Sequence, residues 1–222
     1  MTTEDQAPQS SFRSAIRAAI GLGLFAILTA GLVALVQLNT KERIIEQETR
    51  ARLSALYELV PEQYRENDLL ADSYRLFKGS ASTSEDVFLA RNNDSVSAII
   101  LPWTAPDGYT APIQMLIAIK ADGELIGVRV ISHKETPGLG DNIELTKSDW
   151  IRGFDGRSIA NTESKAWAVK KDGGEFDQLT GATITPRAIV SSVYEALNFF
   201  EMHKTALLNQ APQSELTLAT TP

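Results

Sequence analysis

The stretch APIQMLIAIKADGELIGVRVIS, residues 111–132, decides the fold of this chain. Its two apolar runs, APIQMLIAIK and ELIGVRVIS, are separated only by ADG. Gly123 supplies a residue that tolerates positive φ, which a tight turn between two strands requires. The pattern therefore predicts a hairpin of two antiparallel strands.

Further strands are predicted on the N-terminal side of this hairpin. DVFLAR (86–91) and SVSAIIL (95–101) are short and apolar, as strands of a sheet are. The polar run GSASTSED (79–86) precedes them and is typical of a surface loop.

The C-terminal side combines turns with one long helix. SDWIRGF (148–154) predicts a short helical piece that Ser148 caps, and AWAVKKDGGEFDQL (166–179) predicts a second hairpin that turns at residues 172–174. A helix from Pro186 to about Leu208 is predicted by an apolar stripe: Ile189, Val193, Leu197 and Phe200. Hairpins followed by a single long helix predict an α+β fold, with a mainly antiparallel sheet flanked by helices.

The N-terminal part predicts a transmembrane helix. Residues 18–40 contain no charge and, at about 1.5 Å per residue, are long enough to cross a hydrocarbon core of about 30 Å. A cleaved signal peptide with Arg13 and Arg17 as its basic region is the alternative. The run is longer than a typical signal core and no clean cleavage site follows it, which favours an uncleaved anchor. A helix from Lys41 to Val60, ended by Pro61, is expected to continue from it.

The charges around this span leave its orientation open. Arg13 and Arg17 precede it, and four basic residues follow it at positions 41, 43, 50 and 52. A simple count would keep the large domain in the cytoplasm, but long domains cross membranes largely regardless of flanking charge.

The amino-acid composition argues against several classes of partner and cofactor. Apolar residues make up 43% of the 222 residues, which is typical of a globular protein. The 28 acidic and 21 basic residues give a net charge of −7, which argues against a nucleic-acid partner. The chain has no cysteine and only two histidines, His133 and His203, so we expect no disulfide, no iron–sulfur cluster and no metal site.

The stretch FDQLTGATITPRAIV, residues 176–190, contains more small and hydroxyl residues than a turn needs. Thr185 and Pro186 match the N-cap and first position of a helix, whose N-terminus favours a phosphate. Gly181 and Ala182 would leave the approach to that helix open. These residues alone also fit a capped helix after a tight turn.

The stretch HKETPGLGD, residues 133–141, predicts an open loop. Pro137 favours a turn, and Gly138 and Gly140 allow unusual φ values or close backbone approach. Such a loop could lie against a planar ring or simply connect a strand to a helix. It is no dinucleotide fingerprint, because the third glycine and the βαβ context are absent.

Together the two stretches resemble the FMN-binding domain family. DQLTGAT (177–183) resembles its covalent flavinylation motif, ETPGLG (135–140) resembles its second signature, and DGYTAPIQ (107–114) and residues 167–190 also match. With one N-terminal anchor and this length, the chain resembles the G subunits of Rnf (Rsx) ion-translocating electron-transport complexes over roughly residues 18–208.

The resemblance implies a covalent cofactor. A separate flavin transferase would use FAD to link FMN through its phosphate to Thr183, and Asp177 would belong to the pattern that this transferase recognises. Thr180, Gly181 and Ala182 would line the phosphate, and Thr185 would cap the helix. The flavin ring would lie near the loop formed by Glu135, Thr136, Pro137, Gly138, Leu139 and Gly140.

The resemblance also implies a division of the chain. It would consist of a cytoplasmic tail (1–17), a transmembrane helix (18–40), a helical linker with the first part of the soluble region (41–85), an FMN-binding domain (86–208) and a disordered tail (209–222). The soluble domain would lie in the periplasm, held to the bacterial inner membrane by one span.

The implied function is that of a one-electron carrier among the membrane and redox subunits of such a complex. The chain is not expected to be a complete enzyme and has no expected catalytic residue. Three alternatives remain: the C subunit of a sodium-pumping NADH:quinone reductase, a membrane-anchored FMN-domain sensor or regulator, and a flavin-free scaffold. The membrane partners that co-purify would distinguish the first from an Rnf-type subunit. Regulators of the second kind generally carry further membrane spans or cytoplasmic modules, which are not expected in this chain, and covalent flavin would exclude the third.

Overall fold

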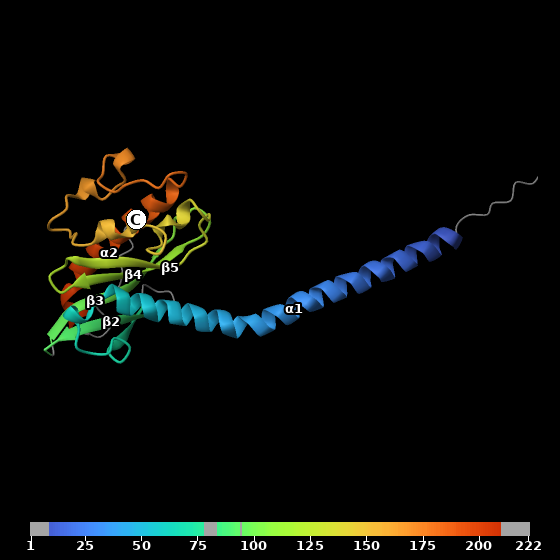
Figure 1. Ribbon diagram of the computed structural model, residues 1–222, viewed down its shortest axis with the longest axis horizontal. Helices are drawn as coiled ribbons and strands as arrows, with labels where there is room; N and C mark the ends of the chain where they lie inside the picture. The colour runs from blue at the N-terminus through green and yellow to red at the C-terminus, as the bar shows by residue number, and fades with distance from the viewer. Residues whose placement is uncertain (1–8, 78–83, 94, 210–222) are drawn as a thin grey trace, which may run out of the picture. The chain divides into compact units, whose positions relative to one another are not determined.

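The computed structural model describes residues 9–77, 84–93 and 95–209 (Figure 1). The start of the predicted N-terminal tail, most of the predicted loop at residues 79–86, and the predicted C-terminal tail from residue 210 lie outside these residues. The chain divides into two compact units, Met1–Arg50 and Ala51–Pro222.

Helix α1 (Gln9–Leu59) contains the predicted membrane span. Residues Ser14–Leu38 have a mean hydropathy of 2.5, and no part of this segment is buried inside the protein. The helix is long and apolar enough there to cross a membrane, as the sequence predicts. Its last residue precedes Pro61 by two positions, in agreement with the predicted end.

The second unit is built on a five-stranded sheet in which every neighbouring pair is antiparallel. The strands, in spatial as in sequence order, are β1 (Ser73–Phe77), β2 (Ser84–Asn92), β3 (Ser95–Ala105), β4 (Ile113–Lys120) and β5 (Leu125–Ser132). The predicted hairpin is confirmed as β4–β5, and Gly123 has φ +104° in its turn. The predicted α+β class is therefore confirmed.

Helix α2 (Ile184–Leu208) covers one face of the sheet. The predicted stripe is confirmed, because its four residues are fully buried against side chains such as Ile99 and Leu101 of β3. Successive strand residues point to opposite faces, so Ala98 and Ile100 lie on the other side of the sheet. There they pack in a second cluster with Leu56, Leu59 and Val60.

Short 3₁₀ helices occupy the remaining segments: η1 (Glu62–Tyr64), η2 (Gly140–Ile143), η3 (Asp149–Phe154), η4 (Ser164–Ala166) and η5 (Lys170–Asp172). The short helical piece predicted at SDWIRGF is η3. The Ser148 hydroxyl accepts a hydrogen bond from the Trp150 N–H at 3.1 Å, as the prediction of a cap requires.

One predicted loop boundary and one predicted hairpin are wrong. Residues Ser84–Asp86 belong to β2, where they pair with β1, a strand that the sequence did not predict. The hairpin predicted over residues 166–179 forms one isolated bridge, between Val169 and Phe176, around η5. Alternation fails at its start, where the adjacent residues Ala166 and Trp167 are both buried, and the rings of Trp167 and Phe176 pack in the core with centroids 5.6 Å apart.

Candidate functional site

The start of α2 differs from the predicted one by about half a turn. The helix begins at Ile184, so Thr183 is its N-cap residue and makes no side-chain cap hydrogen bond. Thr185 is the second helical residue and is fully buried, and its hydroxyl donates to Glu135 Oε2. The predicted capping role of Thr185 is therefore wrong. The proline tolerates the shift because a missing N–H costs little anywhere in the first turn.

Glu135 joins three segments that are distant in the sequence. Its side chain is only 5% exposed. One carboxylate oxygen accepts from the Thr185 hydroxyl, and the other accepts from the Thr110 N–H at 3.2 Å. Buried carboxylates need such donors, so this residue holds the ETPGLG loop, the DGYTAPIQ segment and α2 together.

The small residues before α2 form a tight turn. Ala182 N–H donates to the Leu179 carbonyl at 3.1 Å, and Gly181 has φ +79° at the third position of the turn, where a type II turn needs glycine. Leu179 is buried and anchors the turn in the core. A Cβ atom on Gly181 would lie 2.8 Å from Leu139 Cδ2, so the turn touches the ETPGLG loop closely.

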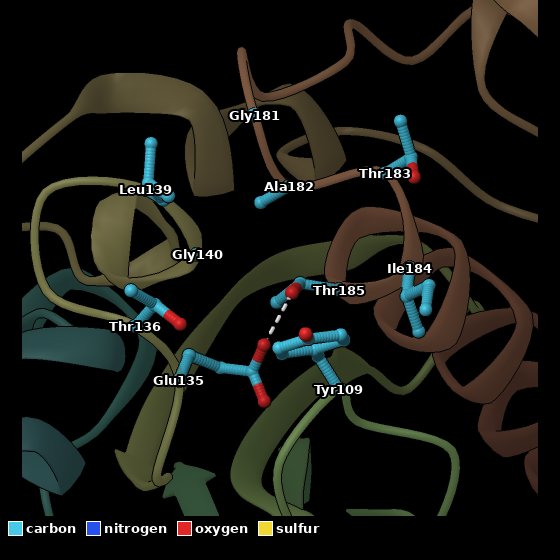
Figure 2. Close-up of a pocket in the computed structure, with 10 residues that line it drawn as sticks. All are labelled: Tyr109, Glu135, Thr136, Leu139, Gly140, Gly181, Ala182, Thr183, Ile184 and Thr185. Atoms are coloured by element: carbon cyan, nitrogen blue, oxygen red, sulfur yellow. Dashed lines mark hydrogen bonds between the residues drawn. The ribbon is translucent and has the colours of Figure 1, made fainter.

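A cavity of about 200 Å³ lies between these segments (Figure 2). Figure 2 shows the loop residues on one side of it and residues 181–185 on the other. It is lined by Tyr109, Glu135, Thr136, Leu139, Gly140, Gly181, Ala182, Thr183, Ile184 and Thr185. The structure thus brings both sequence motifs to one place.

Several predicted site residues lie near the cavity without lining it. Pro137, Gly138 and Thr180 are exposed positions of the same two loops. Asp177 lies on the segment before the turn, where its carboxylate pairs with Lys170 at 2.5 Å and its carbonyl accepts from the Trp150 indole at 2.7 Å.

Two lining residues, Tyr109 and Ile184, have no role in the sequence-based prediction. Tyr109 belongs to the DGYTAPIQ segment, which carried part of the family resemblance. That resemblance could have identified Tyr109 as a residue of the site. With Leu139 they form an apolar rim, being 65% (Tyr109), 40% (Leu139) and 44% (Ile184) exposed. Large apolar groups left exposed beside a cavity favour a ligand that covers them.

The residues present fit FMN. The apolar rim suits a flat ring, and the exposed Thr183 offers an oxygen at the N-terminus of α2, where a phosphate is favoured. None of the ten lining residues is a lysine or an arginine, and Glu135 is the only carboxylate among them.

A series of hydrogen-bonded ionisable groups holds the ETPGLG loop in place. His133 Nδ1 accepts from the Glu135 N–H at 3.0 Å, so the ring proton lies on Nε2, which donates to Glu144 at 2.9 Å. Lys147 donates to both Glu144 and Asp141, at 2.6 and 2.9 Å. The Lys147 hydrogen bond lowers the pKa of the Asp141 carboxyl below its ordinary value, so the charged carboxylate is favoured at the C-terminal end of the loop.

Comparisons with known proteins identify an FMN-binding domain in the same part of the chain. The model of the FMN-binding domain family matches residues 108–198, and that of the RnfG N-terminal region matches residues 1–59. The G subunit of an ion-translocating oxidoreductase complex from Pseudomonas aeruginosa (strain UCBPP-PA14) is 48% identical over 88% of this chain and 93% of its own length. Proteins of the same name from Shewanella loihica (42% identical, 92% and 98% covered) and Vibrio vulnificus (43%, 85% and 90%) are also similar.

Proposed function

Since the chain belongs to the family of G subunits of ion-translocating oxidoreductase complexes, and is thus an FMN-binding electron-transport subunit, we propose that Thr183 binds FMN covalently through its phosphate. The exposed Thr183 hydroxyl, which caps nothing, carries the proposal. Thr185 is buried and bonded to Glu135, and Thr180 lies outside the cavity. Among the three threonines of residues 180–185, Thr183 is therefore the one with both an unbonded hydroxyl and a place on the cavity.

The attachment is a phosphoryl transfer that a separate flavin transferase carries out with FAD. The Thr183 Oγ loses its proton and bonds to the FMN phosphorus, while the bond from that phosphorus to the AMP portion of FAD breaks. The small residues Gly181 and Ala182 support this step, since they leave Thr183 open to a large enzyme. The turn residues and Asp177 form the surface that the transferase would meet.

When bound, FMN supplies one-electron redox chemistry. The chain's own residues orient it: Tyr109, Leu139 and Ile184 present apolar surface to the ring, and Glu135 keeps the three segments of the cavity together. The C subunit of a sodium-pumping quinone reductase and a sensor are not favoured, because relatives that are named as G subunits of ion-translocating complexes align over 85–92% of the chain.

Threonine variants test the attachment. Thr183→Ala should abolish covalent flavin, Thr183→Ser should retain some because serine has the same nucleophilic oxygen, and Thr180→Ala should leave it in place. Peptide mass spectrometry after co-expression with the transferase locates the flavin. Flavin that persists in Thr183→Ala, or that resides on Thr180 or Thr185, would show the assignment to be wrong.

We also propose that the soluble unit lies in the periplasm, at the outer side of the inner membrane. The family resemblance supports this orientation, whereas the simple charge count opposes it. Reporters that work in only one compartment, fused to the C-terminus, decide between the two. Activity of the cytoplasmic reporter alone would overturn the periplasmic placement.

A further inference from the structure

The phosphate that Thr183 would carry meets an unusual electrostatic setting. A phosphodiester is an anion, and the cavity beside it contains the carboxylate of Glu135 but no lysine or arginine among its lining residues. A charge of the same sign in a partly enclosed place is unfavourable. A positive group that approaches Thr183 from outside the cavity lining would offset this repulsion.

The N-terminus of α2 has fewer free N–H donors for an anion than most helices have. Ile184, Thr185 and Pro186 are the first three helical residues, and Pro186 has no N–H. Three of the four N–H groups that a helix start leaves without an intrahelical partner therefore remain for an anion. A side-chain cation is the natural complement.

Arg187 is the first basic residue after Thr183, and it stands four positions further on. Residues four apart on a helix share one face, with Cβ atoms about 5–6 Å apart, and an arginine side chain easily covers that distance. Its planar guanidinium can bind two phosphate oxygens at once, which a lysine cannot do.

The guanidinium of Arg187 pairs with a carboxylate. Arg187 Nε and Nη2 donate to the two oxygens of Asp172 at 2.5 and 2.9 Å, and both side chains are about 40% exposed. The pair links η5 to the first turn of α2, and the Arg187 hydrogen bonds lower the pKa of Asp172. An exposed pair of this kind contributes little stability, so it can be exchanged for another anion at small cost.

We propose that Arg187 is the phosphate-binding residue of this site: it pairs with the flavin nucleotide's phosphate as that group reaches Thr183 and remains beside the phosphodiester afterwards. Asp172 is its partner only while Thr183 is free. This inference rests on the proposed attachment at Thr183 and adds a residue that lies outside both sequence motifs.

The test compares three variants of the full chain in detergent, each incubated with purified flavin transferase and FAD. Arg187→Gln should slow flavin transfer about fivefold, as the loss of one solvent-screened charge-assisted contact predicts. Arg187→Lys should recover part of the rate. Asp172→Asn removes the same ion pair but keeps the cation, so it should speed transfer.

Lys171→Gln is the matched control, because Lys171 is an exposed cation of the same turn. Its rate should stay within about twofold of the unchanged chain, as expected for a solvent-exposed charge. A second measurement is independent of rate: the ³¹P resonance of the flavinylated protein should move in Arg187→Gln and stay in place in Lys171→Gln.

Three outcomes would overturn the role of Arg187. Equal slowing in Arg187→Gln and Lys171→Gln would show a general charge effect, and equal slowing in Asp172→Asn would show that the ion pair merely supports the fold. An unmoved ³¹P resonance in Arg187→Gln would exclude contact with the phosphate. Absence of covalent flavin in the unchanged chain would instead refute the attachment itself.

Discussion

Thr185 is the residue whose role the structure changes most. Replacing it with valine keeps its shape but removes the hydroxyl that donates to the buried Glu135 carboxylate. Thr185→Val should therefore lower the free energy of unfolding by on the order of 1–3 kcal/mol, the cost of leaving a buried acceptor without its donor. Urea unfolding of the full chain in detergent, followed by tryptophan fluorescence, measures it.

Thr183→Val is the control for that substitution. Thr183 is exposed and makes no cap bond, so its replacement should change the free energy of unfolding by less than about 0.5 kcal/mol. Equal losses in the two variants would contradict the separate roles assigned to these threonines. The sequence predicted a helix start here from Thr-Pro, but no local pattern could reveal a carboxylate 50 residues away.

At the scale of elements, the contact between the two loops is the feature to test. Gly138 and Gly181 have nearly the same positive φ, +78° and +79°. A Cβ on Gly181 would lie 2.8 Å from Leu139 Cδ2, whereas a Cβ on Gly138 would have no atom within 4 Å apart from its chain neighbours. Alanine at either position should cost about 1 kcal/mol of backbone strain. Only Gly181→Ala should also turn Leu139 aside and shift the absorption spectrum of the bound flavin.

The Gly138→Ala spectrum is the control for this pair. An equal shift in Gly138→Ala would mean that the loop tip, and not the Leu139–Gly181 contact, borders the ring. From the sequence, Gly138 was as good a candidate as Gly140, because glycine spacing shows where the backbone is unusual but not which neighbour requires it.

Elements with a clear periodicity of apolar residues were predictable from the sequence. Elements that depend on contacts between distant residues were not. The β4–β5 hairpin and the apolar face of α2 follow from local alternation and helical spacing, and both are confirmed. Strand β1 was missed because its pairing partner, β2, lies beyond an intervening polar run. The failed hairpin around η5 had strand-like composition, but its aromatic residues are recruited by the core on α2's side of the sheet.

For the whole molecule, the boundary between anchor and domain can be tested by shortening the chain. The C-terminal end of α1 is part of the second core cluster, where Leu56, Leu59 and the following Val60 are fully buried. The folded unit therefore needs these residues. A chain that starts at Ala51 should fold in solution. A chain that starts at Pro61 should lose on the order of 5 kcal/mol of stability, as several emptied core positions cost.

Circular dichroism and urea unfolding of the two shortened chains measure this difference. Equal stability would show that the sheet face tolerates exposure of its second cluster. The sequence predicts that the FMN-binding domain starts at residue 86, after a helical linker and the first part of the soluble region (41–85). Its burial depends on strands that follow it by more than about twenty residues, which helical periodicity alone does not reveal.

The hydrogen bonds of Glu135 make the cavity a late product of folding. They reach Thr110 across 25 residues and Thr185 across 50, so the cavity is complete only when the sheet, the loop and α2 have all assembled. A nascent or damaged chain presents the threonine motif without the surroundings that hold it. If the proposed attachment at Thr183 requires the assembled cavity, the yellow colour of a molecule would report that its polypeptide has folded.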